Sequence, residues 1–506
     1  MLAPRYSIEE DLPTILHSLA NHPRLVLEAP PGAGKTTQVP LALLRSAWCT
    51  GKILMLEPRR IAARAAATFM AAQRGEAVGD TIGYRIRFER KVSTQTRIEI
   101  LTEGVLTRLL QDDPSLTGVS AVIFDEFHER HLTSDLGLAL CLDIQAGLRP
   151  DLRLVVMSAT LDGERLARFL EAPRVTSAGK MYPVAIQHVA PRASETPALQ
   201  LRRAVSLALD ESAGDVLCFL PGKAEIERAA RMLRDLDVAI ATLHGDLSVD
   251  EQARILQRDS TRRLTLSTNV AESSVTLPNV TAVVDSGLAR EPRFDPASGM
   301  SRLATVPITR SSATQRAGRA GRLAAGKCYR LWPESQRLDP ATRPELQYLE
   351  LSTFVLELKV WGSDSLRFLD PPPAGAMAQA RTLLRNLDAI DAHDRPTPHG
   401  RRLLELGVHP RLGNAMLCAP PHLQGLACDL GAVLEARERR SDAPHDDLRA
   451  RIAALRDFRL HRALEPQVSR GALVTLDQAA QTWRRRVGVR TSIAAIDQTH
   501  AVGDVL

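Results

Sequence analysis

A glycine-rich loop at residues 29–37 is the first stretch of this sequence with an evident chemical use. It reads APPGAGKTT and lies between the apolar stretch RLVLE and the helix-forming stretch QVPLALL. Glycines let backbone N–H groups curl around phosphate oxygens, Lys35 can reach the β and γ phosphates of a nucleotide, and the Thr36 hydroxyl suits Mg²⁺. Ala29 stands where the usual pattern begins with glycine. We expect six residues to hold the phosphates: Gly32, Ala33, Gly34, Lys35, Thr36 and Thr37.

Two adjacent carboxylates, Asp125 and Glu126, follow the apolar stretch VSAVIF. Acidic residues at the carboxyl end of a buried strand, beside a phosphate loop, are placed to act on Mg²⁺ and water. We expect Asp125 to hold Mg²⁺ and Glu126 to polarise the attacking water as a general base. The alternative is that both residues only cap the following helix.

Parallel strands that alternate with helices would bring these two groups together. Residues 1–180 contain five short apolar runs separated by stretches with helical spacing, which is typical of a parallel sheet covered on both faces. The expected strands are 24–30, 52–58, 97–104, 119–126 and 152–160. In such a sheet the phosphate loop and the acidic pair lie at the same edge.

The same alternation starts again at residue 181. The expected strands are 215–222, 238–245, 262–269 and 280–287. A hairpin is expected after the last of these, because Asp295, Pro296, Ser298 and Gly299 supply turn residues between two extended stretches. Beyond residue 345 the strand patterns fade and helices dominate.

These changes divide the 506-residue chain, which is too long for one hydrophobic core, into four expected domains. The predicted fold class is α/β, with two tandem domains and a helical C-terminal part. The predicted bounds are 1–180 and 181–345 for the α/β domains, 346–408 for a winged-helix-like domain and 409–506 for a helical bundle. The chain stops at HAVGDVL without a polar tail, as expected of a truncated bundle.

Composition restricts the class of protein. With 44% hydrophobic and 25% charged residues, and no apolar run near the roughly 18 residues of a membrane span, we expect a cytoplasmic protein with no membrane partner. Six scattered cysteines indicate neither a zinc site nor a disulfide framework. The net charge of +6 fits a polyanionic partner. Only 4% aromatic residues favours contacts with backbone phosphates over base stacking.

Eight ordered motifs between residues 29 and 322 resemble those of the DEAH/RHA branch of superfamily 2 helicases. They read APPGAGKTT, EPRRIAAR, TEGVL, DEFHER, SAT, LHGDLS, STNVAESSVTLPNV and QRAGRAGR. The EPRR and DEFH forms resemble the bacterial HrpB-type helicases in particular. The resemblance implies two RecA-like domains that hydrolyse ATP with Mg²⁺ in the cleft between them, and it implies a further C-terminal region.

The resemblance also assigns roles to residues of these motifs. Gln315 would orient water, and Arg319 and Arg322 would stabilise charge on the γ-phosphate. Three residues would link hydrolysis to domain movement: His128, Ser158 and Thr160. Five would contact phosphates and sugars without reading a sequence: Arg59, Arg60, Thr102, Thr268 and Asn269. For each of these five, ordinary capping or surface polarity is the alternative.

Two departures leave alternatives open. Related helicases hold adenine between an arginine and an aromatic residue, whereas this chain has Phe69 and Leu256 at the corresponding points, so loose base selectivity is our hypothesis. The hairpin from Phe294 to Arg302 resembles a strand-separating hairpin, and a plain surface ribbon is the alternative. The arginine runs at 437–440 and 484–486 are interpreted as solvated helix faces.

The predicted function is an ATP-dependent RNA helicase or translocase that moves along single-stranded RNA, or DNA. The alternative is an ATP-gated RNA clamp or ribonucleoprotein assembly factor with little unwinding. Arginines that stabilise a transition state favour the enzyme, because a clamp does not need them. A protein-translocating motor is disfavoured because no inserted domain interrupts the motifs. A monomer is the default expectation.

Overall fold

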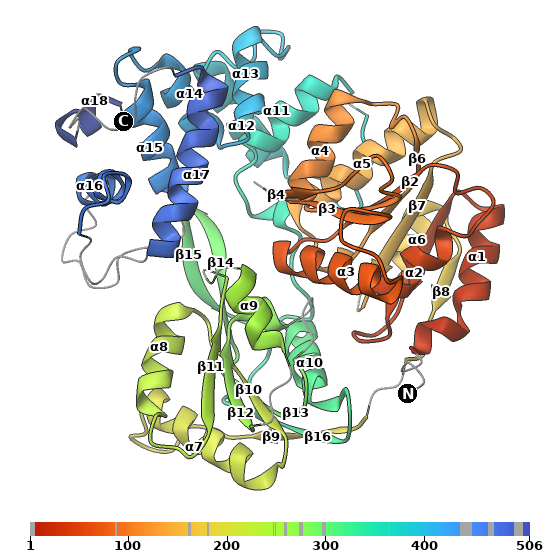
Figure 1. The fold of residues 1–506 in the computed structure, drawn as a ribbon, viewed down its shortest axis with the longest axis vertical. Helices are drawn as coiled ribbons and strands as arrows, with labels where there is room; N and C mark the ends of the chain where they lie inside the picture. The colour runs from red at the N-terminus through yellow and green to blue at the C-terminus, as the bar shows by residue number, and fades with distance from the viewer. Residues whose placement is uncertain are drawn as a thin grey trace. The chain divides into compact units, whose positions relative to one another are not determined.

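The structure is a computed structural model that describes residues 6–86, 89–159, 163–179, 182–245, 247, 249–257, 261–272, 277–295, 300–363, 365–435, 448–463, 470–489 and 499–505. The chain divides into two compact units. The first comprises Met1–Leu349 and Leu366–Pro371, and the second comprises Glu350–Ser365 and Pro372–Leu506. The first unit contains the β-sheets, and the described part of the second is helical (Figure 1).

The first sheet has eight strands in the order β4-β3-β5-β2-β6-β7-β1-β8, and all neighbours are parallel except β3 and β4. Its strands are β1 (Arg24–Glu28), β2 (Lys52–Leu56), β3 (Ile82–Ile86), β4 (Glu89–Lys91), β5 (Ile98–Leu101), β6 (Val119–Phe124), β7 (Arg153–Ser158) and β8 (Arg174–Thr176). The sequence predicted β1, β2, β5, β6 and β7. It missed the three strands at or next to the sheet edges.

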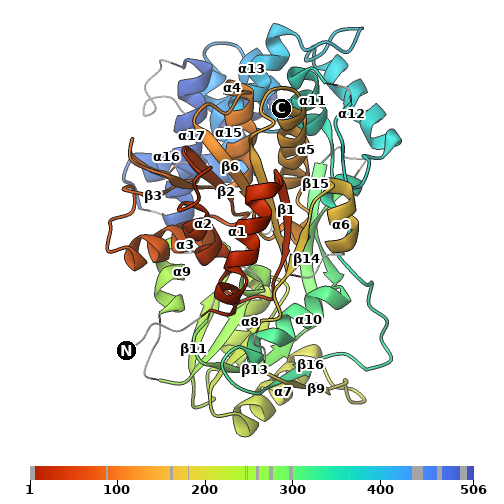
Figure 2. The same ribbon diagram turned by 90° about the vertical axis from the view of Figure 1, so that its right-hand side faces the viewer.

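Helices cover both faces of this sheet (Figure 2). They are α1 (Leu12–Asn21), α2 (Lys35–Leu43), α3 (Arg60–Gln73), α4 (Glu103–Asp112), α5 (Leu132–Gly147) and α6 (Gly163–Leu170). Buried residues of α1, α2 and α3 form one core cluster with alternate strand residues such as Leu27 and Ile123. On the other face, a Cβ added to Gly137 of α5 would stand 3.5 Å from the ring of Phe124. The continuous apolar runs in the strands are therefore used on both sides.

The second sheet has the order β11-β12-β10-β13-β16-β9, with all neighbours parallel. Its strands are β9 (Val184–His188), β10 (Asp215–Phe219), β11 (Ala239–Leu243), β12 (Arg263–Ser267), β13 (Val280–Asp285) and β16 (Gly326–Arg330). The sequence predicted all but β9 and β16. β9 is an edge strand whose residues are exposed or half-buried, so it lacks the apolar run of a central strand.

Helices also pack on both faces of the second sheet. They are α7 (Pro197–Glu211), α8 (Lys223–Met232), α9 (Val249–Leu256) and α10 (Arg310–Gly318). Val205 of α7 and Ile226 of α8 belong to the core cluster on one face. The cluster on the other face includes Ala317 of α10 and also Ile61, which comes from α3 of the first sheet's helices. The two α/β halves of this unit therefore share an apolar contact.

The predicted hairpin is present after β13. It consists of β14 (Leu288–Asp295) and β15 (Met300–Pro307), paired in antiparallel fashion with Phe294 opposite Ser301. The predicted turn residues Pro296, Ser298 and Gly299 lie outside the described residues. The structure thus confirms the hairpin. Whether it separates strands or is a plain surface ribbon stays open, as the sequence left it.

The second unit is built from α11 (Ser352–Trp361), α12 (Ala374–Asn386), α13 (Pro398–Leu406), α14 (Pro410–Cys418), α15 (Gln424–Glu435), α16 (Leu448–Arg459), α17 (Arg470–Val487) and α18 (Val502–Val505). Interpreting Arg484 as a solvated residue was wrong: its side chain is 11% exposed and its Nη2 lies 2.8 Å from Oδ2 of Asp429. Asp429 also pairs with Arg459, which joins α15, α16 and α17. The run at 437–440 lies outside the described residues.

No helix in the described part of the chain is long and apolar enough to cross a membrane. Five of the six cysteines are buried, Cys418 is exposed, and none is in a disulfide. Among the described residues no three His, Cys, Asp or Glu side chains converge as a metal site would require.

Candidate functional site

The glycine-rich loop connects β1 to α2, as the sequence predicted. Gly32 and Gly34 have φ angles of +88° and +90°, a region that favours glycine, and α2 begins at Lys35. A Cβ on Gly34 would also stand 2.8 Å from the Cβ of Tyr6, so this position is closed to larger residues. The loop is therefore shaped by backbone conformations that only these glycines adopt readily.

The acidic pair at the end of β6 meets this loop directly. The Thr36 hydroxyl donates to Oδ2 of Asp125 at 2.5 Å, and the Nζ of Lys35 lies 3.3 Å from Oε1 of Glu126. Lys35, Asp125 and Glu126 are all buried. A hydroxyl and a carboxylate side by side are the protein ligands that Mg²⁺ takes when substrate phosphates complete its coordination. The geometry of Thr36 and Asp125 fits such an ion.

Burial and mutual charge set the protonation of these groups. Burial raises the pKa of Asp125 to about 6, against the opposing charge of Lys35. Burial would also raise the pKa of Glu126, but the charge of Lys35 and its hydrogen bond to Glu126 hold the pKa below its usual value. Burial lowers the pKa of Lys35, yet Glu126 and Asp125 more than compensate. Lys35 and Glu126 are therefore both charged at neutral pH.

Glu57 is a carboxyl of this site that the sequence analysis did not single out. It follows β2, which is the neighbour of β6 in the sheet, and it is 1% exposed. Burial, with the charges of Asp125 and Glu126, raises its pKa well above the usual range. Its position was readable from the sequence, because Glu57 ends a predicted strand as Asp125 does.

The turn after Glu126 is conformationally unusual. Glu126 and Arg130 have φ angles of +49° and +52°, and a short 3-10 turn, Phe127–Glu129, lies between them. Left-handed conformations in residues other than glycine cost about 1–2 kcal/mol each and persist where surrounding contacts enforce them. The direction of the Glu126 side chain therefore depends on what holds this turn.

His128 connects the acidic turn to the end of β7. The N–H of Ala159 donates to Nδ1 of His128 at 3.3 Å, and the neighbouring Ser158 is fully buried. Burial lowers the pKa of His128, so the ring is neutral and Nδ1 accepts. Thr160, the third residue expected to couple hydrolysis to movement, lies outside the described residues.

Arg319 and Arg322 of the second α/β half lie toward the phosphate loop. A Cβ added to Gly32 would stand 4.0 Å from Nε of Arg322. Burial and the charge of Arg322 lower the pKa of Arg319 well below its usual value, and burial lowers the pKa of Arg322 to about 10. An anion bound nearby would therefore stabilise the charged forms of Arg319 and Arg322. Gln315 is half-buried on α10.

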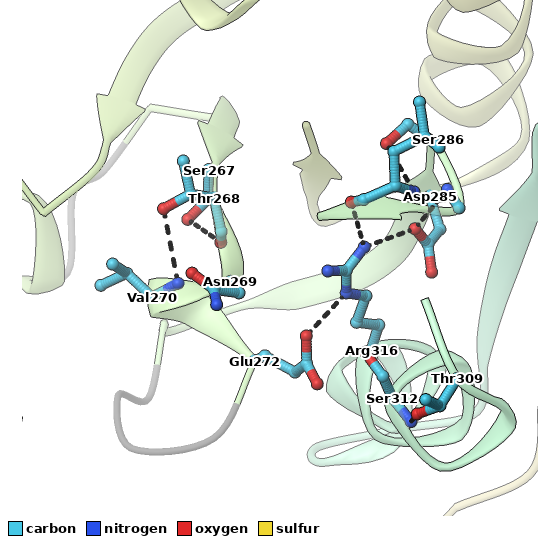
Figure 3. A network of polar contacts seen from close by, with 12 residues as sticks. Ser267, Thr268, Asn269, Val270, Glu272, Asp285, Ser286, Thr309, Ser312 and Arg316 are labelled. Carbon is cyan, nitrogen blue, oxygen red and sulfur yellow. Dashed lines mark hydrogen bonds and ion pairs between the residues drawn. The ribbon is translucent and has the colours of Figure 1, made fainter. Parts of the chain in front are cut away.

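Arg316 is a buried arginine of the same motif to which the sequence analysis assigned no role. Figure 3 shows it between two carboxylates: Nε lies 2.8 Å from Glu272 and Nη1 lies 2.9 Å from Asp285. Arg316 and Asp285 are 1% and 0% exposed. The Nε of Arg319 donates to the carbonyl oxygen of Glu272 at 3.0 Å. Arg316 and Glu272 therefore position the segment that carries Arg319.

The five residues expected to contact RNA have varied surroundings. Arg59 donates from Nη1 to the carbonyl oxygen of Asn269 at 2.8 Å and pairs with Glu129 at 3.1 Å, so it spans the two α/β halves. Arg60 and Asn269 are exposed. Thr102 precedes α4 without a side-chain capping bond, and the Thr268 hydroxyl accepts from the N–H of Val270. Capping therefore accounts for Thr268 but not for Thr102.

The two positions that depart from the related base pocket lie on helices that contact each other, α3 and α9. Phe69 is 41% exposed, and its ring meets that of Tyr6 edge to face at 6.5 Å between centroids. Leu256 is half-buried in a cluster on the second sheet. Neither side chain offers a hydrogen bond to the edge of a base.

Two family models match this chain. The DEAD/DEAH box helicase model matches residues 12–169, and the helicase conserved C-terminal domain model matches residues 200–324. The first match contains the phosphate loop and the acidic pair, and the second contains Arg319 and Arg322.

Similar proteins and structures are known. The chain is 40% identical to ATP-dependent RNA helicase HrpB of Escherichia coli over 444 residues, which is 85% of this chain and 55% of HrpB. It is 34% identical to the probable ATP-dependent RNA helicase DHX35 of Homo sapiens, over 80% of this chain and 62% of that protein. The chain therefore spans less than two thirds of these relatives.

The crystal structure of the E. coli DEAH/RHA helicase HrpB superposes with a TM-score of 0.87 and 37% identity, covering 98% of this chain and 62% of that one. A second structure, described as the E. coli DExH-box NTPase HrpB, gives a TM-score of 0.83. These matches confirm the predicted fold class, with two tandem RecA-like domains and a helical C-terminal part. The four domain boundaries stay predictions.

Proposed function

We propose that this chain, which belongs to the DEAD/DEAH box helicases, hydrolyses ATP between its two RecA-like domains and uses the cycle to move along single-stranded RNA. The observation that carries the proposal is the approach of Arg322 to the phosphate loop, with its Nε 4.0 Å from a Cβ on Gly32. Cationic groups from one domain and a phosphate cradle from the other can thus act on one triphosphate.

The phosphate loop would hold the nucleotide. Backbone N–H groups from Gly32 to Thr37 would contact the phosphate oxygens, and Lys35 would turn from Glu126 to the β and γ phosphates. Thr36 and Asp125 would hold Mg²⁺, which when bound neutralises charge on the phosphates. Support comes from the contact between Thr36 and Asp125.

Glu126 would accept a proton from the attacking water. Lys35 holds the pKa of Glu126 low despite burial, so Glu126 is ionised and able to accept a proton at neutral pH. Arg319 and Arg322 would stabilise the charge that develops on the γ-phosphate, and Gln315 would orient the water. The pKa values of both arginines lie below the usual arginine value, so the surrounding carboxylates do not fully offset the burial of these cations. This imbalance favours binding of an anionic ligand.

The RNA backbone would be held by Arg59, Arg60, Thr102, Thr268 and Asn269. Arg59 is the most informative of these, because it already contacts Asn269 across the two halves. If both residues bind one RNA strand, a relative movement of the two halves would displace that strand. The bond from Ala159 to His128 supports a link between hydrolysis and that movement, with Ser158 and Thr160 in the same segment. A cytoplasmic location and a monomeric state stay predictions.

Steady-state ATPase measurements with and without single-stranded RNA test this proposal. We expect turnover that RNA raises several-fold, because the expected RNA contacts come from both domains, so a bound strand would hold the arginines of the second domain near the phosphate loop of the first. Single-stranded DNA, tested in parallel, decides whether the stimulation needs the 2′-hydroxyl. Turnover that is absent, or slow and unresponsive to either polymer, would instead favour the ATP-gated clamp.

A further inference from the structure

A short segment of the chain returns from the helical unit to the first unit. Leu366–Pro371 belongs to the first unit, although the stretches on either side, Glu350–Ser365 and Pro372–Leu506, belong to the second. We call Leu366–Pro371 the strap. Nothing in the motifs assigns it a role.

The strap is bound to elements that follow two catalytic motifs. Asp370 pairs with Nη1 of Arg130 at 2.7 Å and with Nη2 of Arg165 at 2.7 Å. Arg130 ends the turn that begins at Glu126, and Arg165 lies on α6, the helix after Ser158 and Ala159. One carboxylate therefore bridges the segments that carry the candidate base and the coupling residues.

The two partners of Asp370 differ in burial. Arg130 is 5% exposed, whereas the side chain of Arg165 is 49% exposed. A solvent-exposed ion pair contributes little, whereas a buried cation depends strongly on each partner. Arg130 also makes a two-pronged contact with Asp135 of α5, with both distances 3.1 Å. The pair with Arg130 is therefore the structurally important contact of Asp370.

Arg130 itself is in the left-handed conformation, with a φ angle of +52°, as is Glu126 at the other end of the turn. Its carbonyl oxygen accepts from the N–H of Glu345 at 3.0 Å, so the backbone of this residue is also held. An unfavourable conformation at two ends of one turn persists only when contacts on both sides enforce it. Asp135 supplies one side and the strap supplies the other.

We propose that Asp370 is a positioning residue for ATP hydrolysis: by holding Arg130 it maintains the turn that aims Glu126 and His128. This inference rests on the proposed function. The strap thus makes the catalytic turn dependent on a segment that leads out of the helical unit.

The test compares Asp370→Asn with two controls. Asp370→Asn keeps the shape of the side chain and removes its charge, and we expect kcat for ATP hydrolysis to fall about tenfold or more while KM changes less than about twofold. Glu171→Gln is the matched control, because Glu171 pairs with Arg367 of the strap at 3.1 Å but is 69% exposed. Arg165→Ala removes the exposed partner of Asp370. Both controls should keep kcat within about twofold of the wild type.

A second measurement does not depend on activity. The N–H groups of Glu129 and Arg130 donate to the carbonyl oxygens of Glu126 and Phe127. We expect Asp370→Asn to lose hydrogen-exchange protection in a peptide that covers this turn, and Glu171→Gln to keep it. If the wild type shows no ATPase, the proposed function fails, and exchange still decides the role of Asp370. Unchanged exchange and kcat in Asp370→Asn, or an equal loss in either control, would overturn the inference.

Discussion

The Nζ of Lys35 lies 3.3 Å from Oε1 of Glu126, and the two side chains are 4% and 6% exposed. This buried pair joins the loop after β1 to the end of β6. It places the group expected to grip the phosphates within reach of the group expected to activate water. The two roles can therefore be separated by mutating one partner at a time.

Glu126→Gln should bind ATP but hydrolyse it at least about a hundredfold more slowly, because an amide cannot accept the proton of the attacking water. Lys35→Ala should instead weaken nucleotide binding itself. Single-turnover hydrolysis and equilibrium nucleotide binding measure the two effects. Glu99→Gln is the matched control, since Glu99 of β5 is a buried carboxylate paired with Arg85 of β3. Hydrolysis by Glu126→Gln at the wild-type rate would show that the base is wrongly assigned.

Arg316→Ala should destabilise the fold strongly. It leaves Asp285, which is 0% exposed, without its buried cation, and loss of one partner of a buried pair costs about 3–5 kcal/mol. The urea midpoint of unfolding measures this change. Arg228→Ala, which breaks a surface pair with Glu225, should cost about 1 kcal/mol or less. Similar midpoints for the two variants would mean that the network in Figure 3 contributes little to stability.

Base selectivity should be loose. Phe69 and Leu256 present apolar surface where a hydrogen-bonding pocket would be needed to distinguish bases, and such pockets alone give large discrimination. We expect kcat/KM values for ATP, GTP and CTP within about tenfold of one another. Strict preference for ATP in steady-state hydrolysis would remove this hypothesis. If base selectivity is loose, Phe69→Ala should change the kcat/KM values for ATP, GTP and CTP to a similar extent.

RNA binding should weaken steeply with salt. Each lost phosphate contact on a single strand reduces the slope of log K against log salt by about 0.7. Arg60→Ala should show this reduction, because Arg60 is exposed at the start of α3. Arg45→Ala is the control, since Arg45 is exposed just after the C-terminal end of α2, on the side away from the phosphate loop in sequence. Equal slopes for Arg60→Ala and the wild type would exclude Arg60 from the RNA contacts.

Much of the site was predictable because it is local in the sequence. The phosphate loop needs a strand, two glycines and a helix start in succession, and all three are contiguous from Arg24 to Leu43. The acidic pair follows an apolar run, so its place at the edge of the sheet follows from strand direction. The expected strands were found wherever the apolar run was long enough to be buried on both faces.

Other features depend on pairing between distant residues. Arg316, Arg319 and Arg322 are spaced alike in the sequence, and only the packing of α10 shows that Arg316 is held by Asp285 and Glu272. Likewise, Arg484 was expected in solvent, but α17 packs so that it meets Asp429. Spacing along a helix indicates which residues share a face, not which carboxylate lies opposite.

The amino-acid sequence by itself determined the α/β class, the phosphate loop and the acidic pair, because hydrophobic runs and loop chemistry act over a few residues. Only the tertiary structure decided that Asp370 reaches Arg130, 240 residues earlier, and that Arg59 reaches Asn269, 210 residues later. These contacts bring together polar groups whose positions depend on the packing of whole domains, and no local pattern in the chain indicates which distant residues will meet.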